Sequence, residues 1–347
     1  MSRKEYYYGI DLAKLMGAFL VVSIHTTLFM DVDQQVYTLY TDYVTRFAVP
    51  FFFISSGFFF APLILCKEDR KEIRANAKRY FLRLLRPFAV WGICYFVLAI
   101  AEEVVIEKGP IKEVLPEKLH LLAVESPGGG LWYVYAVLWI VFLMFCFYKK
   151  NREFAFWGIS FALFLLPGIW GFFEEQSGLI GWIQKAYYTV FTSERTFLFF
   201  GIYFFSGVLL FRFKPKKHPV WQFLLLQAAL YGLFVGLHML PKNIGTGILM
   251  QMGKYMISVV WFLIALQIPN ERIPKGWLRD HARQMSTIIY FTHFLAIYLV
   301  KIAFMLLHIR FQEHCSLAYI CCMIILIVYS VVLIKLDKNK KILKKLY

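Results

Sequence analysis

The chain lacks the cysteine patterns that build metal sites and disulfide frameworks. Its six cysteines include no Cys-x-x-Cys pair, and most of them lie within apolar stretches. A zinc site needs closely spaced thiolates or histidines, and a disulfide-stapled fold needs cysteines spread through a short, loop-rich secreted chain. We therefore predict no metal and no disulfide framework.

The chain also lacks the segments that separate or mark soluble domains. No Gly-, Ser- or Pro-rich linker divides it, and no polar stretch is long enough to fold alone. The SPGGG run at 126–130 lacks the Lys-Ser/Thr of a phosphate loop. No small-residue cleavage pattern follows the first apolar stretch, so we interpret that stretch as a transmembrane helix rather than a signal peptide. We predict one polytopic membrane domain over residues 1–347.

Apolar residues dominate the 347-residue chain. Hydrophobic residues make up 60% of it and aromatic residues 19%, and the mean hydropathy is +0.59. A soluble protein could not cover so much apolar surface. Spans need about 20 mostly apolar residues. The fold class that we predict is an all-α membrane protein with about ten transmembrane helices, near residues 9–30, 47–65, 87–106, 131–148, 154–173, 196–212, 219–240, 249–268, 286–307 and 315–335.

The basic residues indicate the orientation in the membrane. The net charge is +16, and most of the 38 Lys and Arg residues lie in short clusters beside alternate spans. Cytoplasmic segments carry such an excess, so both termini are expected in the cytoplasm. In a soluble protein this charge would indicate nucleic-acid binding. Membrane topology explains it here, and we expect the lipid bilayer and no nucleic acid as partner.

Three ionisable residues, Asp11, Lys14 and His25, occur within the first predicted span. On a helix they share one face, and Lys14 and His25 lie about 16 Å apart along the axis. Ionisable groups inside an apolar span are costly and mark functional sites, although a lone membrane histidine is often a hydrogen-bonded packing residue. The shared face favours function. We predict Asp11, Lys14 and His25 as catalytic residues, with His25 as a general base.

The second predicted span begins with Arg46 and contains small residues further along. A cation at a helix start is unfavourable for the helix dipole, so Arg46 either snorkels to the interface or has a specific partner. Pro50 suits the first turn of a helix, and Ser55–Gly57 allow close helix approach. Arg195 precedes a similar FFGIYFFSG run, a faint repeat that chance similarity between Phe-rich helices explains more simply.

Residues 67–86 form the densest basic run in the chain. Apolar residues recur there at helical spacing, which predicts a cytosolic, interfacial amphipathic helix leading into the third span. Binding to anionic lipid headgroups explains the charge. The alternative is a clamp for the phosphates of a cytosolic cofactor, with the candidate residues Lys78, Arg79, Arg83 and Arg86.

Several polar and aromatic residues are candidates for binding an acceptor molecule. Tyr290 and His293 follow Ser286 on one helix face, where core hydrogen bonding is the default interpretation. Trp132 suits an interfacial aromatic belt as well. The adjacent pair 194–195 offers a carboxylate that could offset the Arg charge. The acceptor-binding candidates are Arg46, Ser56, Trp132, Glu194, Arg195, Tyr290 and His293.

Six segments together resemble the acyltransferase 3 family of integral-membrane acyltransferases. They are IDLAKLMGAFLVVSIH, RFAVPFFFISSGFFF, KRYFLRLLRPF, LWYVYAVL, ERTFLFFGIYFFSGVLL and MSTIIYFTHF. The resemblance covers nearly the whole chain and implies ten transmembrane helices. It also implies that His25 is catalytic, that Arg79 and Arg83 belong to the acyl-CoA motif, and that Arg46 and Arg195 line a central cavity. Where the family has an Arg separated from the His by ten intervening residues, this chain has Lys14, which keeps the charge without bidentate hydrogen bonding.

The RFAVPFFFISSG segment is also similar to the membrane half of membrane-bound serine racemases from vancomycin-resistant bacteria. That resemblance implies a transporter of a small polar solute such as L-serine, in a free-standing relative without a racemase domain. We favour a membrane O-acyltransferase that moves an acetyl group from acetyl-CoA to a hydroxyl of a cell-envelope acceptor. Acyl-CoA is then a co-substrate, and no cofactor is expected to be tightly bound.

Overall fold

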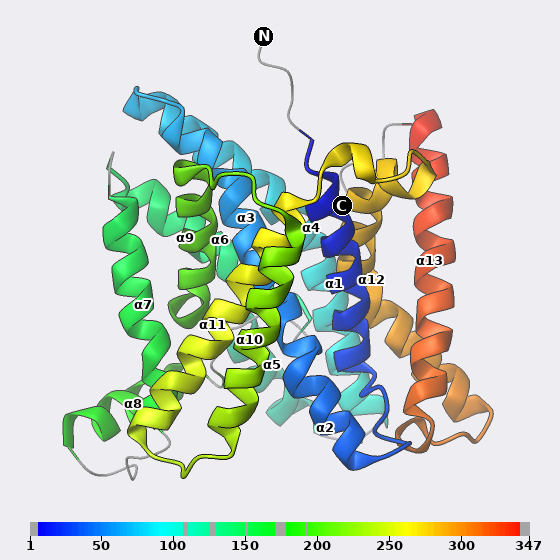
Figure 1. The fold of residues 1–347 in the computed structure, drawn as a ribbon. Helices are drawn as coiled ribbons and strands as arrows, with labels where there is room; N and C mark the ends of the chain where they lie inside the picture. Colours follow the sequence, from blue (N-terminus) through cyan, green and yellow to red (C-terminus); the bar gives the residue numbers. More distant parts are fainter. Residues whose placement is uncertain are drawn as a thin grey trace. The chain divides into compact units, whose positions relative to one another are not determined.

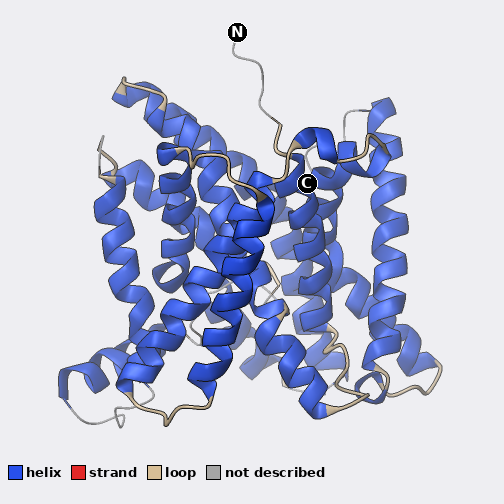
Figure 2. Ribbon diagram, viewed as in Figure 1, coloured by secondary structure: helices blue, strands red, loops and turns tan. Residues whose placement is uncertain are grey.

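The structure is a computed structural model that describes residues 6–106, 110–124, 130–149, 152–170, 178–191, 193 and 195–340. These residues form helices and connecting loops and no strand (Figures 1 and 2). The helices of the first half are α1 (Tyr8–His25), α2 (Gln34–Tyr43), α3 (Ala48–Leu65), α4 (Arg70–Ala101), α5 (Ile111–Val124), α6 (Trp132–Phe147) and α7 (Glu153–Trp170). Those of the second half are α8 (Gly178–Val190), α9 (Phe197–Phe213), α10 (Val220–His238), α11 (Ile244–Gln267), α12 (Trp277–Leu306) and α13 (Cys315–Lys340).

Apolar helices occur at each of the predicted spans. Eight helical segments of the described chain are long and apolar enough to cross a membrane, so this is a multi-pass membrane protein. The other two predicted spans correspond to α6 and α9, which are apolar but shorter, with 16 and 17 residues. The prediction of an all-α membrane fold is confirmed, and a crossing by α6 and α9 stays a prediction.

The basic segment and the third span are one continuous helix. α4 begins at Arg70 and runs for 32 residues, through the predicted boundary at Pro87. Asp69 caps its first turn by accepting a hydrogen bond from the Lys71 amide at 3.0 Å. A proline inside a helix removes one backbone donor and commonly bends the helix, but it does not end this one.

Three segments between the predicted spans, where no helix was predicted, contain helices. α2, α5 and α8 lie within the intervals 31–46, 107–130 and 174–195. The Asp33 side chain explains where α2 begins, because it accepts hydrogen bonds from the amides of Gln35 and Val36 at 2.7 and 2.9 Å. An Asp at this position is a helix start signal that can be read from sequence.

The chain divides into two compact units. Unit 1 comprises Met1–Phe52, His218–Phe223 and Trp261–Tyr347, and unit 2 comprises Phe53–Lys217 and Leu224–Val260. In unit 1, α12 packs against both α1 and α13 (Figure 1). In unit 2, α7 packs against α9, and α6 packs against both α4 and α9.

Small residues bring two helices of unit 2 into backbone contact. A Cβ atom on Gly57 of α3 would overlap the carbonyl oxygen of Phe204, and a Cβ atom on Gly207 of α9 would overlap that of Ile54. Only glycine allows this approach at both positions. The close packing predicted from Ser55–Gly57 is therefore confirmed at Gly57. The residue that Gly57 contacts, Phe204, lies in the FFGIYFFSG run that follows Arg195.

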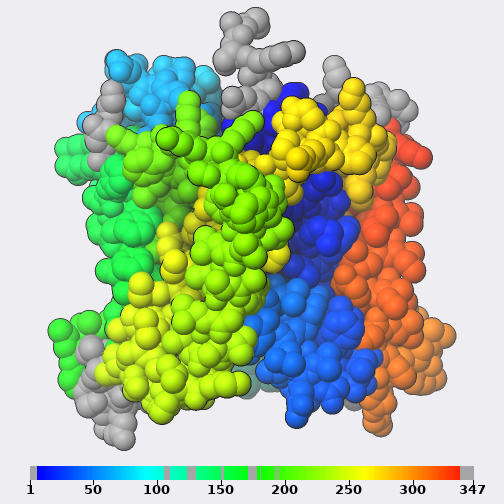
Figure 3. All heavy atoms as spheres, in the orientation of Figure 1, coloured from blue at the N-terminus to red at the C-terminus, as the bar shows by residue number. Residues whose placement is uncertain are grey.

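The outer surface of unit 1 includes a face that suits lipid. The side chains of α13 form a continuous ridge in the space-filling view (Figure 3). Its exposed residues are almost all aliphatic, namely Leu317, Ile320, Ile324, Ile325, Ile327, Val328, Val332 and Leu336. Such a face is expected to contact acyl chains rather than water.

Candidate active site

Two histidines from different helices meet in unit 1. His25 is the last residue of α1, and His293 lies in the middle of α12. Their ring centroids are 5.3 Å apart with 34° between the ring planes, and Phe294 lies 4.6 Å from His25. His25 is half-buried, whereas His293 has no exposed surface. Two residues that we predicted for separate roles, catalysis and acceptor binding, thus share one site.

The His293 ring is held by its own helix. Its Nδ1 lies 2.6 Å from the carbonyl oxygen of Tyr290. Because a carbonyl oxygen only accepts hydrogen bonds, Nδ1 carries the proton, and the neutral ring presents Nε2 as an acceptor. Nε2 is buried and has no hydrogen-bond partner among the described residues. Ser286, Tyr290 and His293 are all buried on α12, as the spacing of the sequence predicted.

The loop after His25 is tied to the start of α13. The Thr27 hydroxyl donates to Cys315 Sγ at 3.1 Å, and Ser316 donates to Asp31 through its amide at 3.0 Å and its hydroxyl at 2.6 Å. Slight burial raises the pKa of the Asp31 carboxyl, but these two hydrogen bonds outweigh it and hold that pKa below its usual value. Both contacts fix the chain that leaves His25.

The unpredicted helix α2 also contacts α1 close to His25. Ser23 donates its hydroxyl to the Leu20 carbonyl at 2.7 Å, so the Tyr40 hydroxyl is the donor in its 2.8 Å contact with Ser23. The Tyr40 ring packs edge-on against Phe29 at 5.1 Å. The end of α1 is therefore fixed from two sides within unit 1.

The opposite end of α1 holds a small charge cluster. Asp11 and Lys14 are half-buried, and the charges of Lys14 and Arg283 both act on the Asp11 carboxylate. Asp11 Oδ1 is buried without a hydrogen-bond partner among the described residues. The sequence grouped Asp11 with Lys14 but missed Arg283, which is brought in by the packing of α12 on α1.

Arg46 has a partner from the segment that precedes it. Its guanidinium lies 2.7 Å from Asp42, four residues earlier, and its side chain is 40% exposed. A specific partner was one of the two alternatives predicted for this cation. The pair is partly exposed, so it contributes little to stability, and its contact with an acceptor stays a prediction.

Other predicted acceptor residues belong to unit 2. The hydroxyls of Ser56 and Tyr133 are 2.5 Å apart, and Trp132 packs against Phe53 and Phe200 with ring centroids at 5.9 and 4.9 Å. Arg195 is exposed. Glu194 lies outside the described residues, so the structure does not place it.

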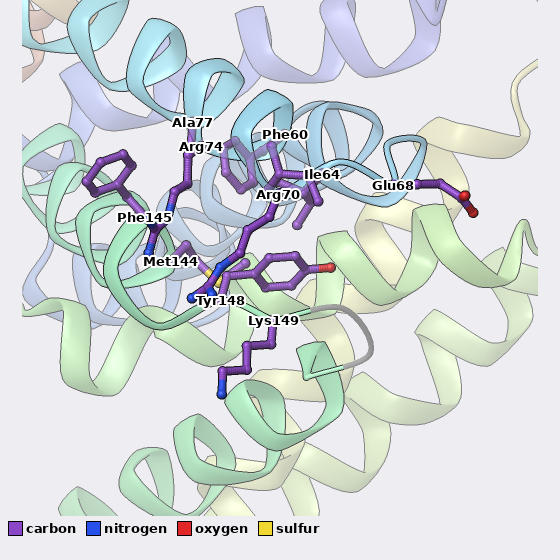
Figure 4. Close-up of a pocket in the computed structure, with 11 residues that line it drawn as sticks. Phe60, Ile64, Glu68, Arg70, Arg74, Ala77, Met144, Phe145, Tyr148 and Lys149 are labelled. Atoms are coloured by element: carbon purple, nitrogen blue, oxygen red, sulfur yellow. The ribbon is translucent and has the colours of Figure 1, made fainter.

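Unit 2 also contains a cavity of about 410 Å³ that the sequence did not indicate (Figure 4). Its wall is apolar where α3, α4 and α6 meet, through residues such as Phe60, Ile73 and Met144. Three cations line it, and Figure 4 shows Arg70 running from α4 toward Tyr148 near Lys149. The cationic residues are Arg70, Arg74 and Lys149, and Glu68 is the one acidic residue in the lining.

The cations that we predicted for acyl-CoA binding lie outside this lining. Lys78, Arg79, Arg83 and Arg86 are exposed on α4, and Arg83 lies 5.0 Å from the centroid of the Tyr80 ring. Arg70 and Arg74 precede them on the same helix at a spacing of four residues, which places both on one face. That spacing was a readable signal, but Lys149 lies just after the end of α6, and only packing reveals that it joins them.

The fold and the histidine pair define a multi-pass helical membrane protein with a polar site between α1 and α12 of unit 1. Residues 7–336 match the acyltransferase 3 family, described as an acyltransferase domain, and the chain belongs to that family. Membership implies a membrane-bound acyltransferase that uses an acyl donor. The resemblance predicted from the sequence motifs is therefore confirmed.

A curated relative matches a short part of the chain. It is an amino-acid racemase from Enterococcus faecalis, 36% identical over 70 residues. The match covers 20% of this chain and 10% of the racemase, so this chain spans only a small part of that relative. No solved structure matches the chain.

Proposed function

We propose that the protein is an O-acyltransferase of the bacterial inner membrane. It moves an acetyl group from cytosolic acetyl-CoA to a hydroxyl of an extracytoplasmic or membrane-embedded acceptor, such as a cell-envelope carbohydrate. The observation that carries this proposal is the His25–His293 pair inside a chain of the acyltransferase 3 family. Ten crossings with both termini in the cytoplasm would put Asp11 and Lys14 at the cytoplasmic end of α1 and His25 at the outer end.

His25 acts as the general base. Its imidazole takes the proton of the acceptor hydroxyl while the oxygen attacks the thioester carbonyl carbon. The carbon–sulfur bond then breaks, and the same proton passes from His25 to the departing CoA thiolate. His25 is the last residue of α1, so the backbone beyond it leaves the helix at the site.

The donor enters from the cytoplasmic side along α4. Acyl-CoA carries several phosphates, and guanidinium and ammonium groups bind phosphate through charge-assisted hydrogen bonds. The three cations that line the 410 Å³ cavity are the better-placed candidates. The exposed cations of α4, which we call the exposed row, would attract the donor or anionic lipid over a longer range. They are Lys78, Arg79, Arg83 and Arg86.

The proposed acceptor-binding residues are those that the sequence predicted. Arg46 or Arg195 would orient it or stabilise the oxyanion of the tetrahedral intermediate. Tyr290 lies beside the histidine pair, with its ring centroid 5.8 Å from that of His293. Ser56, Trp132 and Glu194 complete the proposed set.

Release of free CoA tests the proposal. Inverted membrane vesicles that contain the full chain are supplied with radiolabelled acetyl-CoA, and both free CoA and label in the envelope fraction are measured. Wild-type vesicles should exceed vesicles without the chain, and His25→Ala should lose at least about a hundredfold in rate. Undiminished transfer by His25→Ala would remove His25 from the mechanism.

Transport of a small polar solute is the second candidate, favoured by the partial match to the amino-acid racemase. In that case Asp11, Lys14 and His25 would form a polar relay through the bundle. Right-side-out vesicles should accumulate labelled L-serine without any acyl-CoA. Uptake equal to that of vesicles lacking the chain would exclude this candidate for L-serine.

A further inference from the structure

His293 lies behind His25 and is sealed from solvent. The exposed fraction of His293 is zero, whereas His25 is only half-buried. A residue without accessible surface does not touch a substrate that approaches from the open side of the site. Any effect of His293 on the reaction is therefore exerted through its neighbours, and among these His25 is the proposed general base.

The hydrogen bonding of the His293 ring determines how it can interact with His25. Its Nδ1–H donates to the Tyr290 carbonyl, so the neutral ring can still accept a hydrogen bond at Nε2. Leaving a buried acceptor unpaired is unfavourable. A centroid separation of 5.3 Å lets nitrogens on the facing edges of two imidazoles approach hydrogen-bond distance after a small ring rotation.

We propose that His293 is a positioning residue for His25, accepting at Nε2 a hydrogen bond from one nitrogen of the His25 ring. This inference rests on the proposed acyl transfer and deepens it. The bond selects the His25 tautomer whose other nitrogen is unprotonated and faces the acceptor hydroxyl. A base that is oriented by a third group recurs in enzymes with activated nucleophiles, and such bonds often tighten only when substrate is bound.

The proposed step is balanced in protons and in bonds. His25 takes the hydroxyl proton on its free nitrogen and becomes an imidazolium, while its other N–H stays donated to His293 Nε2. The acceptor oxygen forms the ester bond, the carbon–sulfur bond breaks, and the proton on His25 passes to the thiolate. His25 then returns to the starting tautomer, and His293 has gained and lost no proton.

Two substitutions of His293 separate this role from packing. In His293→Asn the amide nitrogen takes the place of Nδ1 and keeps the bond to Tyr290, but the acceptor at the Nε2 position is lost. In His293→Gln the longer side chain places an amide oxygen near the Nε2 position. His281 is the matched control, because it lies on the same helix and its Nδ1 makes a similar 2.8 Å contact with the Trp277 carbonyl.

The assay is free-CoA release from acetyl-CoA by inverted vesicles that contain each full-length variant. His293→Asn should lower kcat by about 10- to 100-fold and leave KM for acetyl-CoA within about twofold, as loss of a supporting hydrogen bond does in other sites. His293→Gln should retain most of kcat, and His281→Asn should match wild type. Equal kcat values for His293→Asn and His293→Gln would overturn the proposal.

A second measurement does not depend on activity. Nitrogen-15 spectra of the purified full chain in lipid bilayers, with labelled histidine, report the protonation of each ring nitrogen, and His293→Gln identifies the His293 signals by their loss. Nδ1 should be protonated and Nε2 unprotonated, and the Nε2 signal should shift when His25 is replaced by Phe. An unshifted signal would overturn the proposal even if wild-type vesicles release CoA. A shifted signal without CoA release would place the failure in the proposed acyl transfer.

Discussion

Thr27 donates its hydroxyl to Cys315 Sγ at 3.1 Å and so joins the chain that leaves His25 to the first residue of α13. Asp31 repeats this connection four residues later through its two hydrogen bonds from Ser316. The proposed base therefore lies where α1 ends and where α12 and α13 both pack within unit 1. Local contacts of this kind, rather than α1 alone, set the orientation of the His25 ring.

The contact between Asp31 and Ser316 predicts a pH-dependent contribution to stability. The pKa of Asp31 is lower in the folded state than in the unfolded chain, so folding is stabilised fully above the unfolded pKa of about 3.9. This contribution is lost as the pH falls through the folded pKa. At pH 7 in detergent, Ser316→Ala should lower the free energy of unfolding by less than about 1 kcal/mol, because the carboxylate is exposed, and the thermal midpoint should fall slightly. The loss should shrink below pH 3.8 or so.

Asp31→Asn is the control for that measurement. It removes the titrating group, so the effect of Ser316→Ala in the Asp31→Asn background should be the same at both pH values. A Ser316→Ala effect that is equally large at low and neutral pH in the wild-type background would contradict the prediction.

The charge cluster on α1 predicts compensation between two substitutions. Lys14→Met removes one of the two cations that act on the Asp11 carboxylate and leaves Arg283, and weaker compensation of a buried polar group commonly costs about 1–3 kcal/mol. Adding Asp11→Asn should recover most of that loss, because a neutral amide depends less on a nearby cation than a carboxylate does. Lys14→Arg should be tolerated. Thermal melts of the three variants test this, and additive losses in the double variant would argue against a Lys14–Asp11 interaction.

The cavity cations predict which residues bind the acyl donor. Replacing Arg70, Arg74 or Lys149 with Gln should raise KM for acetyl-CoA about tenfold per lost phosphate contact and leave kcat nearly unchanged. The matched controls are Lys78→Gln and Arg79→Gln, which remove exposed cations from the same helix. If the controls raise KM and the cavity variants do not, the phosphates bind along the exposed row instead.

Sequence reasoning was reliable for features set by local physics. Long apolar runs can only be helices in a bilayer, because every backbone polar group must be satisfied within its own segment. Helical spacing likewise placed Asp11, Lys14 and His25 on α1, and Ser286 with His293 on α12. The helix α2 was also readable, since Asp33 is a recognised start signal that we passed over in a segment taken for a loop.

Contacts that depend on packing between segments far apart in the chain could not be predicted from the sequence. His25 and His293 are separated by most of the chain, and nothing in either segment specifies that α1 and α12 are neighbours. The same holds for Arg283 beside Asp11 and for Lys149 in the cavity with Arg70. In a membrane the packing of helices depends on small residues and shape, which a single sequence shows only weakly.

The last prediction concerns one of those small residues. Gly57→Ala would drive a methyl group into the carbonyl of Phe204, and because backbone cannot rotate away, α3 and α9 must separate. Overpacking of this kind costs about 1–3 kcal/mol, so the variant should melt earlier and be recovered in lower yield. Gly158→Ala is the control, because no atom lies within 4 Å of the position its Cβ would occupy. Alanine also favours a helix over glycine, so Gly158→Ala should be neutral or slightly stabilising. Equal melting of the two variants would mean that α3 and α9 do not approach at Gly57 in the folded protein.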